Sequence, residues 1–187
     1  MELCVRNLSK SYDGRAVLEN VSFTAPVGLT RIAGNSGIGK TTLLRILLGL
    51  ERADGGEVAP KNLRWAAVFQ EDRLLEGLDA EGNLRFALGA AYDGQEAARL
   101  LGALGLGDVG GKKVCDYSGG MKRRLALARA LLAPCDALAL DEPFTGLDRT
   151  SRDAALRAVL RAAEEKIVLL AAHEALALPA HCGEVKL

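Results

Sequence analysis

The chain has 187 residues, of which 49% are apolar and 26% charged, which is typical of one soluble globular domain and excludes a disordered or fibrous chain. Lysine plus arginine equals aspartate plus glutamate at 24 each, so the basic excess of a dedicated nucleic-acid-binding protein is absent. The four cysteines lie far apart, without zinc or disulfide-framework spacing. No apolar stretch reaches the ~18 residues of a membrane span. We expect a cytoplasmic chain that inserts into no membrane.

The first third of the chain predicts a small antiparallel β region followed by a strand, a loop and a helix. Apolar residues alternate over 3–8, and a turn at Asp13-Gly14 leads to a second apolar run over 17–23. Beyond this β region, the patterns predict a strand over 29–33, a helix over 43–50, a turn at 54–56 and a strand over 63–69.

A helical pattern occupies the middle of the chain, from about Asp79 to Gly107, with Gly89, Gly94 and Gly102 as interruptions. We interpret it as an inserted helical lobe. Its expected core residues are Leu84, Phe86, Leu88, Leu100, Leu101 and Leu104.

Strands and helices alternate in the second half of the chain. A helix after Gly120 precedes a strand over 137–140, a helix over 149–164 and a strand over 167–171. Alternation of this kind predicts an α/β fold, with a mainly parallel sheet flanked by helices. No repeat or linker divides the chain, so we expect a single domain over 1–187.

Residues 34–41 carry the spacing G-x-x-x-x-G-K-[ST] of a phosphate-binding loop, between a predicted strand and a predicted helix. The glycines let successive backbone N–H groups turn toward phosphate oxygens, and the helix adds the positive end of its dipole. An ordinary glycine-rich turn is the alternative, which the full match in context disfavours. The phosphate-binding candidates are Asn35, Ser36, Gly37, Gly39, Lys40, Thr41 and Thr42, with the Thr41 hydroxyl available to Mg²⁺.

Two acidic residues, Asp141 and Glu142, end the apolar strand over 137–140. Ligands of open α/β sheets bind at the carboxyl ends of the strands. We therefore expect Asp141 to hold Mg²⁺ through water and Glu142 to polarise an attacking water. A strand that simply enters a solvated loop is the alternative.

The segment Tyr117-Ser118-Gly119-Gly120-Met121, with the helix that follows it, resembles the signature motif of ABC-type ATPases. Further motifs occur in the family's order along the chain. They are Gln70 for the Q-loop, Asp141-Glu142-Pro143 for the Walker B end, Thr145-Gly146-Leu147-Asp148 for the D-loop and His173 for the switch histidine. The resemblance covers the chain from about Leu3 to His173. It implies the P-loop NTPase fold, with the helical lobe, about 75–133, inserted into a RecA-like core.

The resemblance also implies the cofactors and the roles of the site residues. ATP and Mg²⁺ are the expected cofactors, and Tyr12 is placed like the aromatic residue that stacks on adenine. The implied catalytic residues are Lys40, Gln70, Glu142 and His173, and the implied metal site comprises Thr41, Gln70 and Asp141.

A second anion-binding helix start is implied at Ser118, Gly119 and Gly120. In the family, two subunits pair head to tail and sandwich ATP between one subunit's phosphate loop and the other's signature motif. We therefore expect an ATP-dependent dimer, with a homodimer as the simplest form. Ser118 as an ordinary N-cap is the alternative for this motif. The following Lys122, Arg123 and Arg124 are expected on a solvated helix face.

Three departures from the family pattern bear on the turnover rate and the strength of the dimer. Tyr117 and Met121 replace the commonest leucine and glutamine of the signature motif, and Gly146 stands where alanine is frequent. The chain beyond His173 is short, so we expect no C-terminal regulatory domain.

The resulting hypothesis is an ATP-hydrolysing subunit of an ABC transporter, peripheral on the inner face of the cell membrane and coupled to a separate permease. The stretch 69–75, together with Met121 and the stretch 141–144, is most similar to ATPases of nitrate, sulfonate and taurine importers. One alternative is a soluble ABC ATPase that serves iron–sulfur assembly or translation. Another is a nucleotide-dependent switch that hydrolyses ATP too slowly to power transport.

Overall fold

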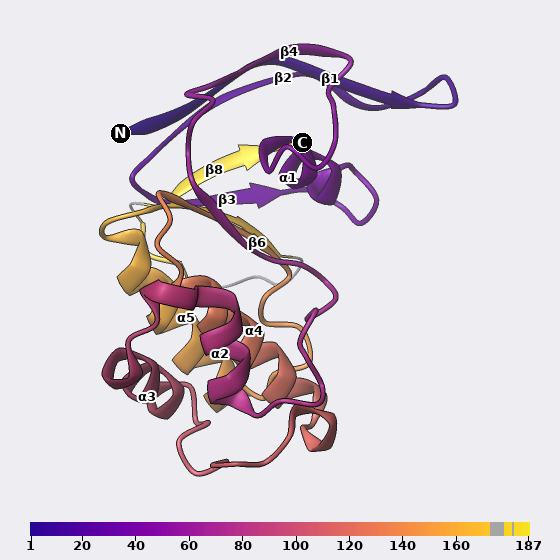
Figure 1. Ribbon diagram of the computed structural model, residues 1–187. Helices are drawn as coiled ribbons and strands as arrows, with labels where there is room; N and C mark the ends of the chain where they lie inside the picture. The colour runs from indigo at the N-terminus through magenta and orange to yellow at the C-terminus, as the bar shows by residue number, and fades with distance from the viewer. Residues whose placement is uncertain (173–177, 181) are drawn as a thin grey trace.

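The computed structural model describes residues 1–172, 178–180 and 182–187 of the chain. An antiparallel sheet lies above a parallel sheet in Figure 1, and helices cover both faces of the parallel sheet. The α/β fold with a small N-terminal antiparallel region, predicted from the sequence, is confirmed.

Five parallel strands form the central sheet in the spatial order β5-β6-β7-β3-β8. They are β3 (Gly28–Ala33), β5 (Trp65–Val68), β6 (Ala137–Asp141), β7 (Ile167–Ala171) and β8 (Gly183–Lys186). Alternate residues of β6 enter opposite cores: Ala139 packs toward the antiparallel sheet, and Leu138 and Leu140 pack toward the helices beneath. Because both faces are covered, this strand is apolar along its whole length.

The antiparallel sheet has the order β2-β1-β4, with β1 (Glu2–Tyr12) joined to β2 (Arg15–Pro26) by the predicted turn. The sequence predicted only a turn at 54–56, whereas β4 (Gly55–Ala59) begins there and pairs with β1. Gly56 explains the difference. Its φ is 95°, and a Cβ on it would lie 2.5 Å from the Asn7 carbonyl oxygen. Glycine thus permits the close approach of β4 to β1.

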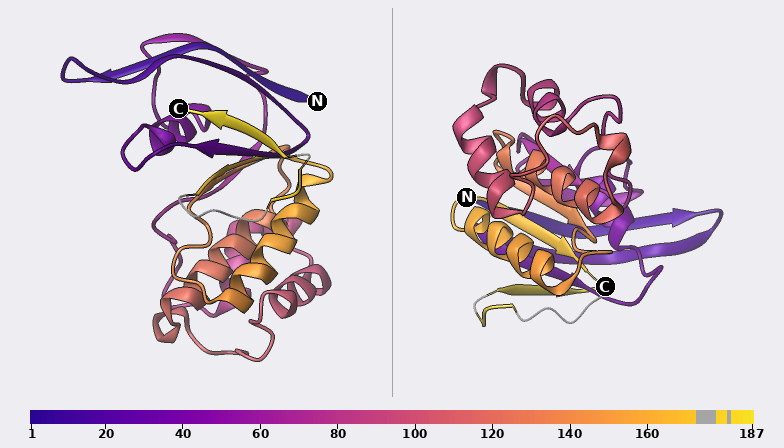
Figure 2. Two further views of the ribbon diagram at one scale, coloured as in Figure 1. Left: turned by 180° about the vertical axis from the view of Figure 1, so that it is seen from behind. Right: turned by 90° about the horizontal axis from the view of Figure 1, so that it is seen from below.

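Three helices flank the parallel sheet. The first, α1 (Lys40–Leu47), lies between the two sheets, while α4 (Gly119–Leu132) and α5 (Arg149–Ala163) lie side by side on the opposite face (Figure 2). Asp148 caps α5 by accepting a hydrogen bond from the Ser151 N–H at 2.9 Å.

The helical lobe contains α2 (Ala80–Leu88) and α3 (Gly94–Ala103), which pack on the first half of α4, and two short 3₁₀ helices, Gly89–Ala91 and Val114–Asp116. Gly94 begins α3, and Gly102 lies inside α3 rather than interrupting it. Leu84 and Leu104 are buried as predicted, and Leu88, Leu100 and Leu101 are partly buried.

The prediction of Phe86 as a core residue is wrong, because its side chain is 74% exposed. Leu84 and Leu88 are four residues apart on α2 and face the core, and Phe86 lies halfway between them on the outer face.

α4 belongs to two cores. Leu125 packs with α2 and α3, whereas Leu127 and Ala128 pack beneath the parallel sheet. The domain boundaries at 75 and 133 stay a prediction. Among the described helices, none is both long enough and apolar enough to cross a membrane.

Candidate nucleotide site

The loop over 34–39 connects β3 to α1 and depends on its glycines. Gly39 is buried with a φ of 112°, and a Cβ on it would lie 2.9 Å from the Val17 carbonyl oxygen. Gly34 has a φ of 153°, and its Cβ would lie 2.7 Å from the Ile38 side chain. Only glycine fits both positions without displacement.

The side chain of Lys40 turns back into this loop. Its ammonium donates hydrogen bonds to the carbonyl oxygens of Gly34 at 2.8 Å and Asn35 at 2.9 Å, and the residue is 6% exposed. Asn35, Ser36 and Gly37 are exposed on the loop. A buried cation beside the backbone N–H groups of a helix start is an arrangement suited to a phosphate group.

The first residues of α1, Lys40 to Thr42, supply backbone N–H groups that have no acceptor within the helix. No side chain caps this helix start, which distinguishes it from the starts of α2, α3, α4 and α5. The positive end of the α1 dipole and the N–H groups of its first turn therefore face the loop.

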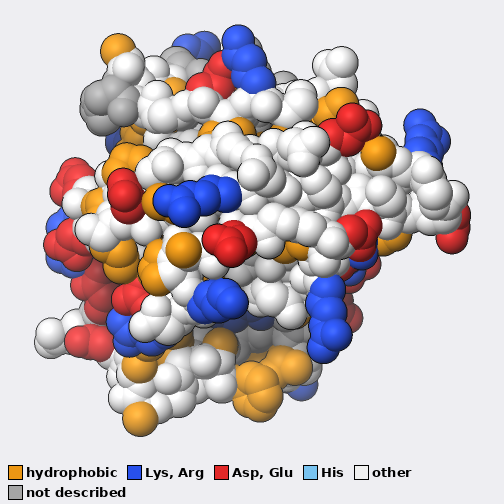
Figure 3. All heavy atoms as spheres, turned by 90° about the horizontal axis from the view of Figure 1, so that it is seen from above, with side chains coloured by type: hydrophobic (Ala, Val, Ile, Leu, Met, Phe, Trp, Pro, Cys, Tyr) orange, Lys and Arg blue, Asp and Glu red, His pale blue; other side chains and the backbone are white. Residues whose placement is uncertain are grey.

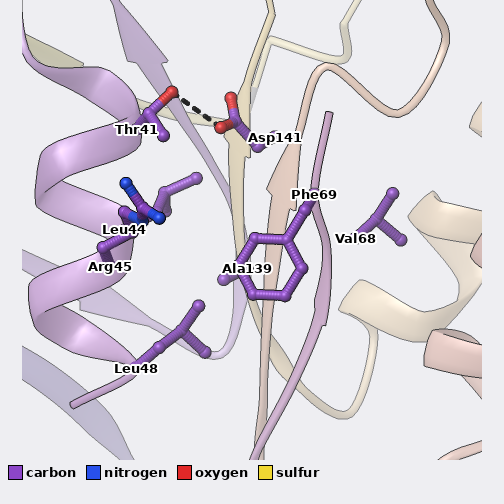
Figure 4. A pocket seen from close by; sticks show the side chains of 8 residues that line it. All are labelled: Thr41, Leu44, Arg45, Leu48, Val68, Phe69, Ala139 and Asp141. Carbon is purple, nitrogen blue, oxygen red and sulfur yellow. Dashed lines mark hydrogen bonds between the residues drawn. The ribbon is translucent and has the colours of Figure 1, made fainter. Parts of the chain in front are cut away.

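Thr41 and Asp141 meet between α1 and the carboxyl end of β6, in the pocket drawn in Figure 4. The Thr41 hydroxyl donates to an Asp141 carboxylate oxygen at 2.7 Å. Asp141 is 3% exposed, and burial raises its pKa. The Thr41 hydrogen bond opposes this rise, and the charge of the neighbouring Glu142 increases it. A hydroxyl and a carboxylate are hard oxygen ligands, so these two residues fit a partly hydrated Mg²⁺.

Glu142 follows β6 with a φ of 51°, unusual for a residue other than glycine, asparagine or aspartate. Its N–H donates to the Ala171 carbonyl oxygen at 2.8 Å, and its carboxylate accepts from the Thr145 hydroxyl at 3.1 Å. Sparsely populated backbone conformations of this kind cluster at functional sites. Here the conformation fixes where the carboxylate leaves the sheet edge.

Gln70 is exposed and lies just beyond β5, next to Phe69, which lines the same pocket as Thr41 and Asp141. The structure therefore brings the Gln70 segment to the site predicted from the sequence. His173 lies outside the described residues.

Tyr12 ends β1 and is 42% exposed. Its hydroxyl donates a hydrogen bond to Glu51, which raises the pKa of Tyr12 together with burial, while a contact with Thr42 opposes the rise. The tyrosine thus lies beside the start of α1.

Ser118 caps α4 and accepts a hydrogen bond from the Met121 N–H at 3.3 Å. Both interpretations of this segment, an anion site and a capped helix, share this geometry. Tyr117 is 6% exposed and fills the core of the helical lobe. The starts of α1 and α4 belong to helices on opposite faces of the parallel sheet (Figure 1).

The prediction of a solvated face at 122–124 is wrong for Arg123, which is 8% exposed. Its guanidinium donates to the carbonyl oxygens of Phe69, at 2.5 Å, and Gln70, and lies 3.1 Å from an Asp72 carboxylate oxygen. Helical periodicity along α4 could not reveal a loop that packs over this helix.

Taken together, the loop, the buried lysine and the threonine–aspartate pair at the carboxyl edge define a nucleotide-binding domain of the P-loop class. Comparison with known proteins gives the family: the ABC transporter family model matches residues 18–145. The chain belongs to the ABC transporter family, as an ATPase subunit.

Curated relatives include an aliphatic sulfonates import ATP-binding protein of Paracoccus denitrificans, 38% identical over 92% of this chain and 73% of that protein. A protein of the same description from Cupriavidus necator is 42% identical over 80% of this chain and 53% of its own length. The chain thus spans from about half to three quarters of these relatives.

Among solved structures, a putative ABC transporter ATP-binding protein from Pyrococcus furiosus superposes with a TM-score of 0.87 at 26% identity, covering 100% of this chain and 97% of that one. The resemblance stated from the sequence, to ATPases of sulfonate-type importers, is confirmed.

Proposed function

We propose that this chain binds and hydrolyses ATP with Mg²⁺ and thereby drives the import of a small solute through a separate membrane permease. The observation that carries the proposal is the meeting of the buried Lys40 loop with the Thr41–Asp141 pair at one edge of the sheet. ATP binding follows from the family, and the sulfonate-import relatives support the transport assignment.

Each site residue has a role in this proposal. Lys40 and the N–H groups of residues 35–42 bind the phosphates, and Tyr12 stacks on the adenine. Thr41, Asp141 and Gln70 hold Mg²⁺ directly or through water, and the ion neutralises phosphate charge. Glu142 accepts the proton of the attacking water, and His173 contacts the terminal phosphate.

The second ATPase subunit supplies the signature segment. α1 and α4 lie on opposite faces of the parallel sheet, so one chain does not bring Ser118, Gly119 and Gly120 to the phosphates held by its own loop. An isologous dimer brings each signature segment to the partner's phosphates. The expected contact is ATP-dependent, because the phosphates form part of the interface.

Light scattering during gel filtration tests the dimer. The Glu142→Gln variant should double its mass on addition of ATP, and a further Ser118→Arg substitution should keep it monomeric by placing a bulky side chain at the anion site. A Glu142→Gln variant that stays monomeric at saturating ATP would contradict the paired arrangement.

The permease places the chain on the inner face of the cell membrane. On the side of the molecule shown in Figure 3, lysine and arginine side chains of the described residues are interspersed with acidic ones, and they form no large patch of one charge. This mixture favours a protein partner over nucleic acid.

Co-purification tests the permease. Tagged Glu142→Gln is expressed in the native cell, extracted gently from membranes with ATP present, and its partners are identified by mass spectrometry. An integral membrane protein with several spans supports the importer assignment. A soluble scaffold or ribosomes without a membrane protein would instead favour a soluble ABC ATPase.

A further inference from the structure

Two arginines of α4, the buried Arg123 and the half-buried Arg129, bind the backbone that carries Gln70. Arg123 donates to the carbonyl oxygens of Phe69 and Gln70, and Arg129 donates to those of Asp72 at 2.9 Å and Arg73 at 2.6 Å. Four of the five backbone carbonyl oxygens over 69–73 therefore accept hydrogen bonds from side chains of a single helix.

This segment is also constrained internally. Arg73 has a φ of 48°, which is unusual for a residue outside glycine, asparagine and aspartate. Its guanidinium lies over the Phe69 ring, 4.3 Å from the centroid. Strained conformations persist where surrounding contacts determine them, and the arginine–carbonyl bonds are such contacts.

Asp72 supplies the negative charge among these cations. Its side chain is 21% exposed and that of Arg123 is 10% exposed. Burial raises the pKa of Asp72, and the charges of Arg123, Arg129 and Lys122 oppose that rise. Buried ion pairs contribute little net stability compared with apolar packing, but they hold their partners in one geometry.

An arginine fork suits this task better than lysine. The planar guanidinium of Arg123 donates hydrogen bonds to two adjacent carbonyl oxygens and also lies within ion-pair distance of the Asp72 carboxylate. An ammonium, in contrast, is a single point of charge on a flexible stem. Arg123 lies five residues after Ser118, within the same helix that begins at the signature segment.

We propose that Arg123, paired with Asp72, is a positioning residue that holds the Gln70 backbone against α4. The position of Gln70 relative to the nucleotide then depends on the position of the signature segment, from which α4 begins. This inference rests on the proposed function of Gln70. Arg123 contacts the backbone at Phe69 and Gln70 rather than the Gln70 side chain. Its effect on the reaction passes through the Gln70 backbone.

The first test is Arg123→Lys, measured by steady-state ATP hydrolysis and ATP binding. The variant keeps the positive charge next to Asp72 and loses the fork on the two carbonyl oxygens. We expect kcat to fall roughly 10-fold, since misplacing a reacting group by about 1 Å costs up to about 100-fold. ATP affinity should stay unchanged, because the Lys40 loop is not altered.

Arg64→Lys is the matched control. Arg64 lies just before β5, whereas Gln70 lies just after it. Arg64 also forms an arginine–aspartate pair, in which two of its nitrogens donate to Asp136 at 3.0 and 2.8 Å. This control removes a fork of the same kind, and kcat should stay at the wild-type value. An equal fall in both variants would overturn the inference, because it would indicate a general effect on the sheet.

A double-mutant cycle with Gln70→Ala separates positioning from a general structural role. Once the Gln70 side chain is gone, Arg123→Lys should lower kcat no further. Asp72→Asn, which removes the counter-charge but keeps the shape, should show the same dependence on Gln70 and guards against misfolding of the arginine variant.

The outcomes distinguish two failures. If the wild type hydrolyses ATP and Gln70→Ala slows it, but the Arg123 and Gln70 effects simply multiply, the positioning inference is wrong and the proposed function stands. If Gln70→Ala leaves turnover unchanged, both the role of Gln70 and the inference built on it are wrong.

Discussion

The two ends of β6 carry aspartates in opposite electrostatic situations. At the amino end, Asp136 accepts from the Arg64 backbone N–H at 2.9 Å and from its guanidinium, which lowers the pKa of Asp136 to about 2. At the carboxyl end, Asp141 has a hydroxyl as its hydrogen-bond partner, and burial raises its pKa. The two aspartates are five positions apart. Asp136 is paired with an arginine, whereas the charges of Lys40 and Arg123 only partly oppose the rise in the pKa of Asp141.

This difference shows which end of the sheet is built for structure and which for a ligand. Asp136 has its counter-charge within the chain, so its end of the strand is complete by itself. Asp141 is buried beside a neutral hydroxyl, an arrangement that a divalent cation would stabilise. The carboxyl edge is also where open α/β sheets bind their ligands.

The middle of β6 supports both ends, so Leu138→Ala sets the scale for a purely structural change. Leu138 is fully buried in the core beneath the sheet. The cavity should lower the free energy of unfolding by about 3 kcal/mol, within the range for buried leucine. Urea denaturation measures this loss. ATP affinity of the folded protein should not change. A large change would contradict the separation of the core residue Leu138 from the nucleotide site.

Lys40→Ala should strongly weaken nucleotide binding at the carboxyl edge. Loss of a charged, buried donor to phosphate should lower ATP affinity by roughly 100-fold. Isothermal titration calorimetry measures it. Arg64→Ala, a cationic side chain lost at the amino edge, serves as the control and should bind ATP normally. Retained affinity in Lys40→Ala would show that the loop is not the phosphate site.

Asp141→Asn should affect the metal more than the nucleotide. Removal of the carboxylate charge should raise the Mg²⁺ concentration needed for half-maximal hydrolysis by roughly 10-fold, while ATP affinity without Mg²⁺ stays the same. A Mg²⁺ titration of turnover measures this. Asp136→Asn, the corresponding change at the other end of β6, should leave the titration unmoved. Identical shifts in the two variants would refute the contrast between the ends.

Acid stability gives the smallest effect. Because the pKa of Asp136 is about 2 in the folded chain and about 3.9 in an unfolded one, its pair with Arg64 stabilises the fold above about pH 4. That contribution is lost as the pH falls from about 4 to about 2. Unfolding of wild type and Asp136→Asn should therefore differ at neutral pH and converge near about pH 2. A constant difference throughout would contradict the assigned pKa.

The parts of this molecule that were predictable from sequence are those determined by neighbouring residues. The loop over 34–41 and the acids after β6 follow from a short motif and a strand end, and both lie where expected. The strand β4 and the exposure of Phe86 were not predicted. A glycine-rich strand forms only where a partner strand pairs with it, and which side of a short helix is buried depends on the elements that pack against it.

Arg123 is the clearest case of information absent from local pattern. In sequence it belongs to a run of three basic residues, which usually marks a solvated face. Its acceptors lie more than fifty residues earlier in the chain, in a loop whose path the periodicity of α4 does not encode. Only the folded structure brings them together.

Glu142→Gln tests the catalytic role of the carboxyl edge most directly. ATP affinity and steady-state ATP hydrolysis are measured on one preparation of the variant and one of the wild type. Removal of the proton acceptor should abolish turnover and leave ATP affinity at the wild-type value. Hydrolysis at the wild-type rate by Glu142→Gln would contradict the assignment of this edge as the site where ATP is hydrolysed.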